Sequence, residues 1–270
     1  TDTLTFSSNF EKLFNRPRSI EHYLRDKHFL EIIHPDDLHL LPSTKSTELS
    51  EDDFMRFDAR LLTSENTYQW FTICFKVLRD NAGNPTNVIG RLSNINDKKL
   101  EEDRLRREAQ TDMLTGLYNK MTFKQLAEDM LSEGTHALII VDIDDFKNVN
   151  DTYGHLAGDQ ALQQTAAALT AAFRPQDLIG RLGGDEFAIC VNGRIDDERL
   201  AIACAGIVKR GVTFTDQYGT EHEVTLSIGG VELHGKIASY QSAYRQADKA
   251  LYRAKAGGKN RFVIGSYQAE

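Results

Sequence analysis

The sequence predicts an α+β protein with an N-terminal antiparallel-sheet domain, a linker helix and a C-terminal domain built on a mixed α/β sheet. Apolar and polar residues alternate along three runs between positions 54 and 95, which is the period of half-buried strands. After position 111, strand-like and helix-like segments alternate instead. The 270 residues are enough for two domains, which we place at 1–96 and 111–265 on either side of a helix at 97–110.

Short elements are expected before the sheet of the first domain. Apolar spacing indicates a strand near 4–6 and a helix near 10–14. The sequence His-Pro-Asp-Asp at 34–37 is typical of a helix start, because proline fits the first helical position and acids favour the first turn. The expected strands of the sheet are 54–62, 68–78 and 88–95.

The segment 97–110 differs in composition from both domains. Five acids and five bases occupy its 14 positions, and Leu100, Leu105 and Ala109 form only a sparse apolar stripe. Such a helix can be a plain solvated linker, or a signalling helix with a partial coiled-coil seam in a parallel dimer. The composition alone favours neither interpretation.

The second domain alternates strands and helices. Thr122 is expected to cap a helix that ends near Leu131, and 136–142 has the composition of a buried strand. The other expected helices are 145–150, 159–173, 197–208 and 239–255, and the other expected strands are 178–182, 186–191, 212–214, 224–228 and 262–264. We predict that the strands form one mixed sheet.

Composition disfavours several classes of protein. The 40 acidic residues outnumber the 32 basic ones, and a net charge of −8 argues against a nucleic-acid binder or a membrane-surface binder. The three cysteines, Cys74, Cys190 and Cys204, form no CxxC pair, which is typical of a reducing compartment. No apolar run approaches the ~20 residues that span a bilayer. We therefore expect a cytoplasmic protein, or the cytoplasmic part of a longer one.

Two acidic clusters carry the strongest chemical signal. The sequence RLGGDEF at 181–187 predicts a tight glycine hairpin followed by two carboxylates, which taken alone is more often a solvated turn. The sequence DIDD at 142–145 follows an apolar strand, where an acid is costly unless it is paired or binds a metal. Together, two such strand ends could hold Mg²⁺, and a helix start near Phe146 would offer N–H groups to phosphates. A phosphoryl- or nucleotidyl-transfer site is therefore predicted.

Other nucleotide and hydrolase motifs do not fit. The segment 230–237 is similar to a P-loop, but it lacks the final Ser or Thr and opens no convincing helix. The motifs GxGxxG, HExxH and GxSxG do not occur.

These residues match a known family. Positions 111–264 closely resemble the GGDEF domain of diguanylate cyclases, whose naming pentamer lies at 183–187. Three more segments match in order and spacing, DMLTGLYNK at 112–120, DIDDFKNVNDTYGH at 142–155 and ADKALYRAK at 247–255. The resemblance implies a fold like that of nucleotidyl cyclases and an enzyme that condenses two GTP molecules into cyclic di-GMP with release of two pyrophosphates. It also implies a homodimer, because each domain holds one GTP.

The resemblance implies a metal site and catalytic groups. Asp142, the carbonyl of Ile143 and Asp185 are expected to bind two Mg²⁺ or Mn²⁺ ions per active site, with Glu186 as a weaker candidate. Asp185 could also be the base for the attacking 3′-hydroxyl, although a metal-bound carboxylate is a poor base. Glu186 and Lys147 complete the set of candidate catalytic residues.

The resemblance also implies a GTP site. Lys249 and Arg253 lie four residues apart on one helix and could reach the same triphosphate, although alone they would be interpreted as a solvated helix face. Asn150 and Asp159 would read the base, because a carboxylate accepts from the guanine N1–H and 2-amino groups, which adenine lacks. The remaining expected contacts are the backbone N–H groups of Asp145, Phe146 and Lys147, and Gly184.

Two features concern regulation. The sequence from Arg174 to Asp177 resembles the RxxD product-inhibition site of the family, in which arginine can clamp a phosphate or stack on guanine. Lys120 stands where the opening motif of the domain usually has arginine, so a salt bridge between Lys120 and Asp112 would be looser.

The N-terminal third resembles a PAS domain less specifically, through 34–37 and through the run 90–97 before the charged helix. PAS modules sense ligands or mediate dimers, and the ligand here is unknown. A haem site is disfavoured because histidines in such positions are more often surface or capping groups, and this applies to His22, His28, His34 and His39.

We therefore predict a diguanylate cyclase regulated by a PAS sensor, with GTP as substrate and cyclic di-GMP as product. Two other classes remain open. A catalytically silent GGDEF module would bind GTP or cyclic di-GMP to regulate a partner, and a pure interaction protein would bind no nucleotide. We expect no nucleic-acid partner and no membrane segment.

Overall fold

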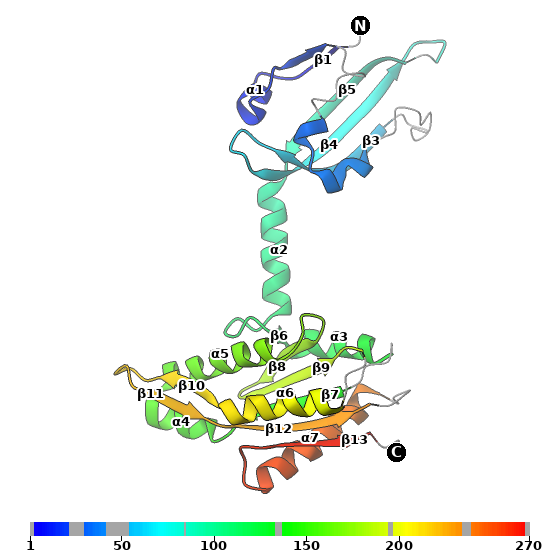
Figure 1. Cartoon of the computed structure of the whole chain (residues 1–270). Helices are drawn as coiled ribbons and strands as arrows, with labels where there is room; N and C mark the ends of the chain where they lie inside the picture. Colours follow the sequence, from blue (N-terminus) through cyan, green and yellow to red (C-terminus); the bar gives the residue numbers. More distant parts are fainter. Residues whose placement is uncertain are drawn as a thin grey trace. The chain divides into compact units, whose positions relative to one another are not determined.

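The computed structural model describes residues 3–21, 30–41, 54–83, 85–132, 137–193, 197–233 and 239–267 (Figure 1). The chain divides into two units, Thr1–Leu105 and Arg106–Glu270, within helix α2 (Asn96–Gln110). The boundaries expected at 96 and 110 stay predictions. No helix in the described ranges is long and apolar enough to cross a membrane. His22, His28 and the end of the P-loop-like segment lie outside the described residues.

The N-terminal unit contains the antiparallel sheet that the alternation predicted. The strands pair in the order β3 (Phe54–Leu62), β4 (Tyr68–Arg79) and β5 (Pro85–Asn94). The smaller elements before them are β1 (Thr3–Thr5), α1 (Asn9–Phe14), β2 (Ser19–Glu21) and the short 3-10 helices η1 (Leu30–Ile32) and η2 (Pro35–Leu40). Alternate side chains from parts of β3 and β4 enter a core with α1 and η1, formed by Phe10, Phe14, Ile32, Ile33, Ala59, Leu61, Phe71 and Ile73.

A buried ion pair joins η2 to this sheet. Asp37 is 6% exposed and accepts hydrogen bonds from the backbone N, Nε and Nη2 of Arg60 at 2.8, 2.9 and 2.7 Å. These hydrogen bonds hold the pKa of Asp37 below its usual value. The helix start predicted at 34–37 is confirmed, since Nδ1 of His34 accepts from the Asp36 N–H at 3.3 Å. His34 is therefore a capping histidine.

Helix α2 begins on the sheet of the N-terminal unit. The Trp70 carbonyl accepts from the Ile95 N–H at 2.9 Å, and the Asn96 side chain accepts from the Trp70 N–H at 3.3 Å. Lys99 forms an ion pair of 3.3 Å with Asp58. None of the α2 residues is buried, so the charged pattern of this segment produces a solvated helix.

The C-terminal unit contains the predicted mixed sheet. Its six strands lie in the order β13 (Phe262–Ser266), β12 (Leu226–Glu232), β7 (Ala137–Ile143), β9 (Glu186–Val191), β8 (Leu178–Gly183) and β6 (Tyr118–Asn119). The central pairings, from β12 through β7 and β9 to β8, are antiparallel, and the outermost strands β13 and β6 pair in parallel.

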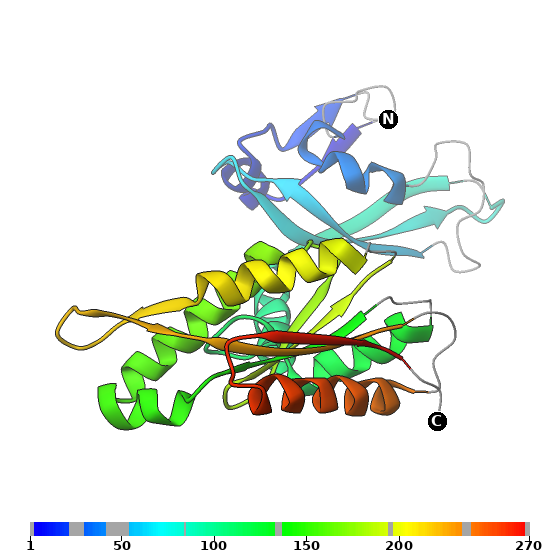
Figure 2. The same cartoon turned by 60° about the horizontal axis from the view of Figure 1, so that its bottom comes forward.

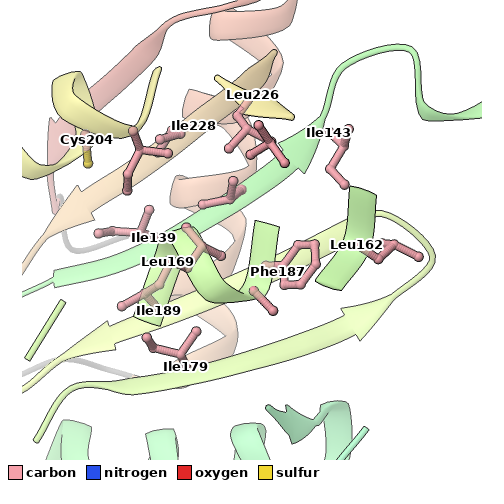
Figure 3. Packing of buried hydrophobic residues seen from close by; sticks show 14 of the residues in the cluster. Ile139, Ile143, Leu162, Leu169, Ile179, Phe187, Ile189, Cys204, Leu226 and Ile228 are labelled. Carbon is pink, nitrogen blue, oxygen red and sulfur yellow. The ribbon is translucent and has the colours of Figure 1, made fainter. Parts of the chain in front are cut away.

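Helices cover both faces of this sheet (Figure 2). One face packs on α4 (Phe146–Tyr153), α5 (His155–Ala172) and α6 (Asp197–Arg210), and the other on α3 (Lys120–Ser132) and α7 (Tyr240–Ala256). Strand β7 supplies both cores, because Ile139, Val141 and Ile143 enter the first and Leu138 and Ile140 the second. Figure 3 shows the first of these cores, with Ile139 and Ile143 labelled. The alternation places the next residue, 142, on the α7 face.

Two expected boundaries in this unit are wrong. Thr122 lies inside α3, and Asn119 caps the helix, because its side chain accepts from the Thr122 N–H at 3.0 Å. The strand expected at 224–228 is two strands that separate at Thr225. The first, β11 (Glu221–Val224), pairs with β10 (Val212–Thr215) in a separate hairpin, whereas β12 joins the main sheet. The Thr225 carbonyl instead accepts from the Asp144 N–H at 2.9 Å, outside both ladders.

Helix α7 lies directly against β12 at Gly229. A Cβ at this position would overlap the backbone N of Leu251 and the carbonyl of Ala247. Only glycine therefore lets the helix approach this closely.

We expect Gly229→Ala to lower the free energy of unfolding of the C-terminal unit by about 3 kcal/mol, because the added methyl meets backbone atoms that cannot rotate away. Gly230→Ala is the matched control, since its Cβ would lie 3.4 and 3.5 Å from two side-chain atoms and 3.8 Å from the Leu138 carbonyl, which are distances of ordinary contact. Far-UV circular dichroism in urea measures the loss. Fluorescence of Trp70, the chain's single tryptophan, reports the N-terminal unit and should not change. Equal losses for both variants would contradict the close approach at Gly229.

Candidate active site

A row of polar side chains crosses the centre of the C-terminal sheet. In the strand register Asp142 of β7 lies opposite Glu186 of β9 on one side and opposite Ser227 of β12 on the other. Residues that face each other in this way share a face of the sheet, and two like charges so placed are unfavourable. The site therefore favours a cation beside Asp142.

Asp142 is buried at 5% exposure, and Nζ of Lys255 lies 2.7 Å from its Oδ2. Burial raises the pKa of Asp142 to about 6; the hydrogen bond from Lys255 opposes this rise, and the charges of Asp185 and Glu186 add to it. Negative charge is thus in excess around this carboxyl, although one lysine already neutralises part of it.

The hairpin between β8 and β9 brings Asp185 to the same end of the sheet. Gly183 and Gly184 form the turn with φ angles of 137° and 55°, which other residues rarely adopt. The Asp185 carbonyl accepts from the Ile143 N–H at 3.4 Å, so the turn is joined to the end of β7. Nε and Nη2 of Arg181 donate to the Gly184 carbonyl at 3.0 and 2.7 Å. These contacts hold the backbone of the turn that leads into Asp185 and Glu186.

The same Arg181 is also the partner of Asp112, and the salt bridge expected between Asp112 and Lys120 is wrong. Nη1 of Arg181 lies 3.1 and 3.2 Å from the two oxygens of Asp112. Burial would raise the pKa of Asp112, but hydrogen bonds from Thr115 and Arg181 outweigh it and lower that pKa. The residues lie 69 positions apart, so no local pattern indicated the pair.

The turn after β7 leads into a helix start. Asp145 precedes α4 with a left-handed φ of 56°, and its carbonyl accepts from the N–H groups of Asn148 and Val149 at 2.8 and 3.3 Å. The first N–H groups of a helix have no acceptor within it, and here they belong to Phe146 and Lys147. The positive end of the helix dipole makes this position suitable for phosphate.

Two lysines reach this end of the sheet, and the sequence analysis missed both. Besides the contact of Lys255 with Asp142, Nζ of Lys259 lies 2.6 Å from Oδ1 of Asp145. Lys255 is the last residue of the matched segment at 247–255, and Lys259 follows four residues later, in the turn after α7. That spacing was a signal, but the distances become visible only in the folded chain.

The structure does not bring Lys249 and Arg253 to the acidic cluster. Arg253 and Lys249 precede Lys255 by two and six residues, so their side chains point roughly 160° and 120° away from that of Lys255 around α7. Lys249 and Arg253 are exposed and, with Asp248 and Tyr252, line a surface hollow of about 560 Å³. Both therefore lie on a different face of the helix from the Asp142 contact.

The two expected base-reading residues lie on adjacent helices. Asn150 belongs to α4, and its side chain packs so closely on Gly158 of α5 that no Cβ fits there. Asp159 follows Gly158 and is half-buried. Helix packing thus brings Asn150 beside the turn of α5 that carries Asp159.

The RxxD segment has a structural function in this chain. Asp177 is 8% exposed, and its carboxylate accepts from the N–H groups of Arg174 and Asn192 at 2.9 and 3.0 Å. These bonds close the turn before β8 and attach it to the end of β9. Arg174 is partly exposed beside it. A product-inhibition site at these residues stays a prediction.

The donors gathered around Asp142 suit a hard cation. Carboxylates and backbone carbonyls are the ligands that Mg²⁺ prefers. Asp142, Asp185 and Glu186 supply carboxylates, and the last two lie close enough for their charges to raise the pKa of Asp142. Within the described ranges, no three His, Cys, Asp or Glu side chains already converge on one point. The donor types therefore fit a metal, while the Asp142 carboxylate contacts Lys255.

Comparisons with known proteins agree with this geometry. The family described as "Diguanylate cyclase, GGDEF domain" matches residues 109–261, and the PAS fold matches residues 3–92. The crystal structure of the coiled coil and GGDEF domain of DgcB from Caulobacter crescentus in complex with c-di-GMP is similar, with 30% identity and a TM-score of 0.55. The similarity covers 62% of this chain and 93% of that chain.

Curated relatives carry related names. "Probable diguanylate cyclase DgcT" of Escherichia coli K12 is 36% identical over 162 residues, which are 58% of this chain and 36% of the relative. "Diguanylate cyclase DgcS" of Shewanella oneidensis is 34% identical over 168 residues, or 60% and 54% of the two chains. "Cyclic di-GMP phosphodiesterase PdeR" of Escherichia coli K12 is 30% identical over 176 residues, or 64% and 26%. The match thus spans at most about half of each relative.

The family match covers more than half of the chain and includes the Asp142 strand, the glycine hairpin and the helix that carries Lys255. The chain therefore belongs to the GGDEF family of diguanylate cyclases.

Proposed function

We propose that this chain condenses two GTP molecules into cyclic di-GMP and releases two pyrophosphates. The observation that carries the proposal is the cross-strand pair of Asp142 and Glu186, with Asp185 on the adjoining hairpin. The start of α4, at Phe146, follows Asp142 by four residues. Carboxylates beside a phosphate-binding helix start are the components that nucleotidyl transfer needs.

The carboxylates would hold the metal ions. Asp142, the carbonyl of Ile143 and Asp185 are the proposed ligands of two Mg²⁺ or Mn²⁺ ions, with Glu186 as a further ligand. When bound, these ions would neutralise the triphosphate and lower the pKa of the attacking 3′-hydroxyl. Asp185 is also a candidate base for that hydroxyl, a role that metal coordination weakens.

Cations and backbone donors would bind the triphosphate. The N–H groups of Asp145, Phe146 and Lys147 form the anion-binding start of α4, close to Gly184 in the proposed site. We propose Lys255 and Lys259 as the side chains that bind phosphate, because their ammonium groups already lie at this end of the sheet. A phosphate would compete with the carboxylates for both lysines.

Asn150 and Asp159 would select guanine. The Asp159 carboxylate can accept from N1–H and the 2-amino group of guanine, and adenine would leave it without a donor. The packing of Asn150 on Gly158 holds the two residues in a fixed relation. We therefore propose GTP, and not ATP, as the substrate.

The reaction needs two copies of the chain, because each site would hold one GTP. We propose a homodimer in which the PAS unit changes how the catalytic domains meet, as a population shift between arrangements. Leu100 and Leu105 of α2 are 60% and 51% exposed, which favours the signalling helix over the plain linker. A monomer under turnover conditions, shown by crosslinking, would contradict this arrangement.

One alternative has an observation in its favour. The same part of this chain also matches a relative named as a phosphodiesterase. A silent GGDEF module, which binds GTP or cyclic di-GMP and regulates a partner, would fit such a relationship.

Product analysis tests the proposed reaction. The purified chain incubated with GTP and Mg²⁺ should yield cyclic di-GMP on chromatography, and Asp185→Ala should reduce the yield at least about a hundredfold through loss of a metal ligand. Glu198→Ala, on the exposed surface of α6, is the control and should leave the yield unchanged. GTP binding without product in the parent chain would favour the silent module.

Steady-state kinetics distinguish the two sets of basic residues on and after α7. Lys255→Ala and Lys259→Ala should each raise the KM for GTP at least about tenfold, because each loses a charge-assisted contact to phosphate. Lys249→Ala and Arg253→Ala should change it less than about twofold, since exposed charges on another face contribute little. The opposite ranking would support the assignment made from the sequence.

The raised pKa of Asp142 predicts a stability cost. Its folded-state pKa of about 6 exceeds the ordinary value of 3.8, so ionisation destabilises the fold increasingly as pH rises between these values and fully above 6. In EDTA, Asp142→Asn should therefore unfold with a free energy about 1–2 kcal/mol higher than wild type at pH 8, with a smaller gain at pH 4.5. Urea unfolding followed by circular dichroism measures this gain. A gain that shrinks as pH rises would refute the sign.

A further inference from the structure

Asp144 is a buried carboxylate that the proposed reaction does not use. It is 5% exposed, and it lies between Asp142 and Asp145. Its Oδ1 accepts from the Ser227 hydroxyl at 2.6 Å, and its Oδ2 accepts from the Thr225 hydroxyl at 2.7 Å and from the Asn260 N–H at 3.0 Å. These bonds join the end of β7 to β12 and to the turn after α7.

The turn after α7 has an unfavourable backbone. Lys259 and Asn260 are consecutive non-glycine residues with φ angles of 59° and 46°. This left-handed region crowds the Cβ against the following carbonyl, so it persists only where other contacts determine it. The Lys259 N–H donates to the Ala254 carbonyl at 3.2 Å within the turn. From the segment after β7, Asp144 accepts from the Asn260 N–H, which is the contact made to the backbone of this pair.

The position of Lys259 depends on this turn. Its side chain extends from the left-handed pair to Asp145, where Nζ and Oδ1 are 2.6 Å apart. Asp144 and Asp145 are adjacent, so one acid binds the backbone of the turn and the next binds its side chain. A turn that relaxed to a right-handed conformation would move the ammonium group away from the start of α4.

We propose that Asp144 is a positioning residue for GTP binding. It holds Lys259 and Asn260 in their left-handed conformation and thereby presents Lys259 to the triphosphate at the start of α4. This inference rests on the proposed function for its ligand, whereas the contact with the turn stands on the geometry alone.

An electrostatic role and a positioning role of Asp144 predict opposite effects of Asp144→Ala on GTP affinity. A negative charge beside a triphosphate weakens its binding, so an electrostatic role would make Asp144→Asn bind GTP more tightly and Asp144→Ala equally so. For a positioning role the asparagine amide suffices, because its oxygen can accept from Thr225 and Asn260 while its nitrogen donates to the Ser227 hydroxyl. Asp144→Ala removes every one of these contacts.

Hydrogen exchange of the full-length chain tests the contact without any ligand. In Asp144→Ala the amide of Asn260, measured in peptides covering 257–261, should exchange at least about tenfold faster than in wild type, because it has lost its acceptor. Asp144→Asn and Lys259→Ala should keep the wild-type rate, since both retain an acceptor for this amide. Unchanged exchange in Asp144→Ala would overturn the inference.

Binding of 3′-deoxy-GTP tests the role in GTP binding, because this analogue lacks the attacking hydroxyl and cannot react. Calorimetry with Mg²⁺ should show affinity about tenfold weaker for Asp144→Ala and for Lys259→Ala, and the double variant should be no weaker than Lys259→Ala alone. Asp144→Asn should bind as wild type does, or more tightly. Additive losses, or an asparagine variant as weak as alanine, would overturn the positioning role.

The two proposals fail in different ways. A wild-type chain that binds no 3′-deoxy-GTP would refute the proposed function, and with it the ligand named for Lys259. Normal binding by wild type together with normal binding by Asp144→Ala would refute only the role of Asp144.

Discussion

The antiparallel pairing of β7 with β9 on one side and β12 on the other determines the candidate site. Its register places Asp142, Glu186 and Ser227 in one row on the α7 face of the sheet. A shift of one residue would turn Asp142 into the opposite core, among Ile139 and Val141. The apolar side chains of β7 that fill both cores therefore also fix the position of the Asp142 carboxylate.

The acids at and after the end of β7 create a local excess of negative charge. Basic groups at the end of α7 and in the turn after it neutralise part of this charge. Lys255 and Lys259 form ion pairs with Asp142 and Asp145, and Asp144 binds the backbone of the same turn. Asp142 near the end of β7, and Asp144 and Asp145 just after it, thus contact the last turn of α7 and the turn that follows it. Under the proposed function, a bound nucleotide and its metal ions would replace the two ion pairs, while the Asp144 contact would remain.

Arg181 gives the hairpin a connection to the start of the domain. Its guanidinium binds Asp112, two residues after α2, and the Gly184 carbonyl, one residue before Asp185. A change at the end of α2 would therefore act on the backbone that carries a proposed metal ligand. At its other end α2 is attached to the sheet of the PAS unit through Ile95, Asn96 and Lys99.

Periodicity and short motifs are properties of neighbouring residues, and they were enough to predict the fold class, the mixed sheet and the two acidic clusters. They did not determine which distant side chains meet. The pairs of Arg181 with Asp112, of Lys255 with Asp142 and of Asp144 with Asn260 join residues 69 to 116 positions apart. Helical spacing made Lys249 and Arg253 plausible phosphate ligands, yet only the packing of α7 on Gly229 decides which of its faces meets β7. Neighbouring residues determine where helices and strands form, and the burial of their apolar faces decides which polar groups are brought together.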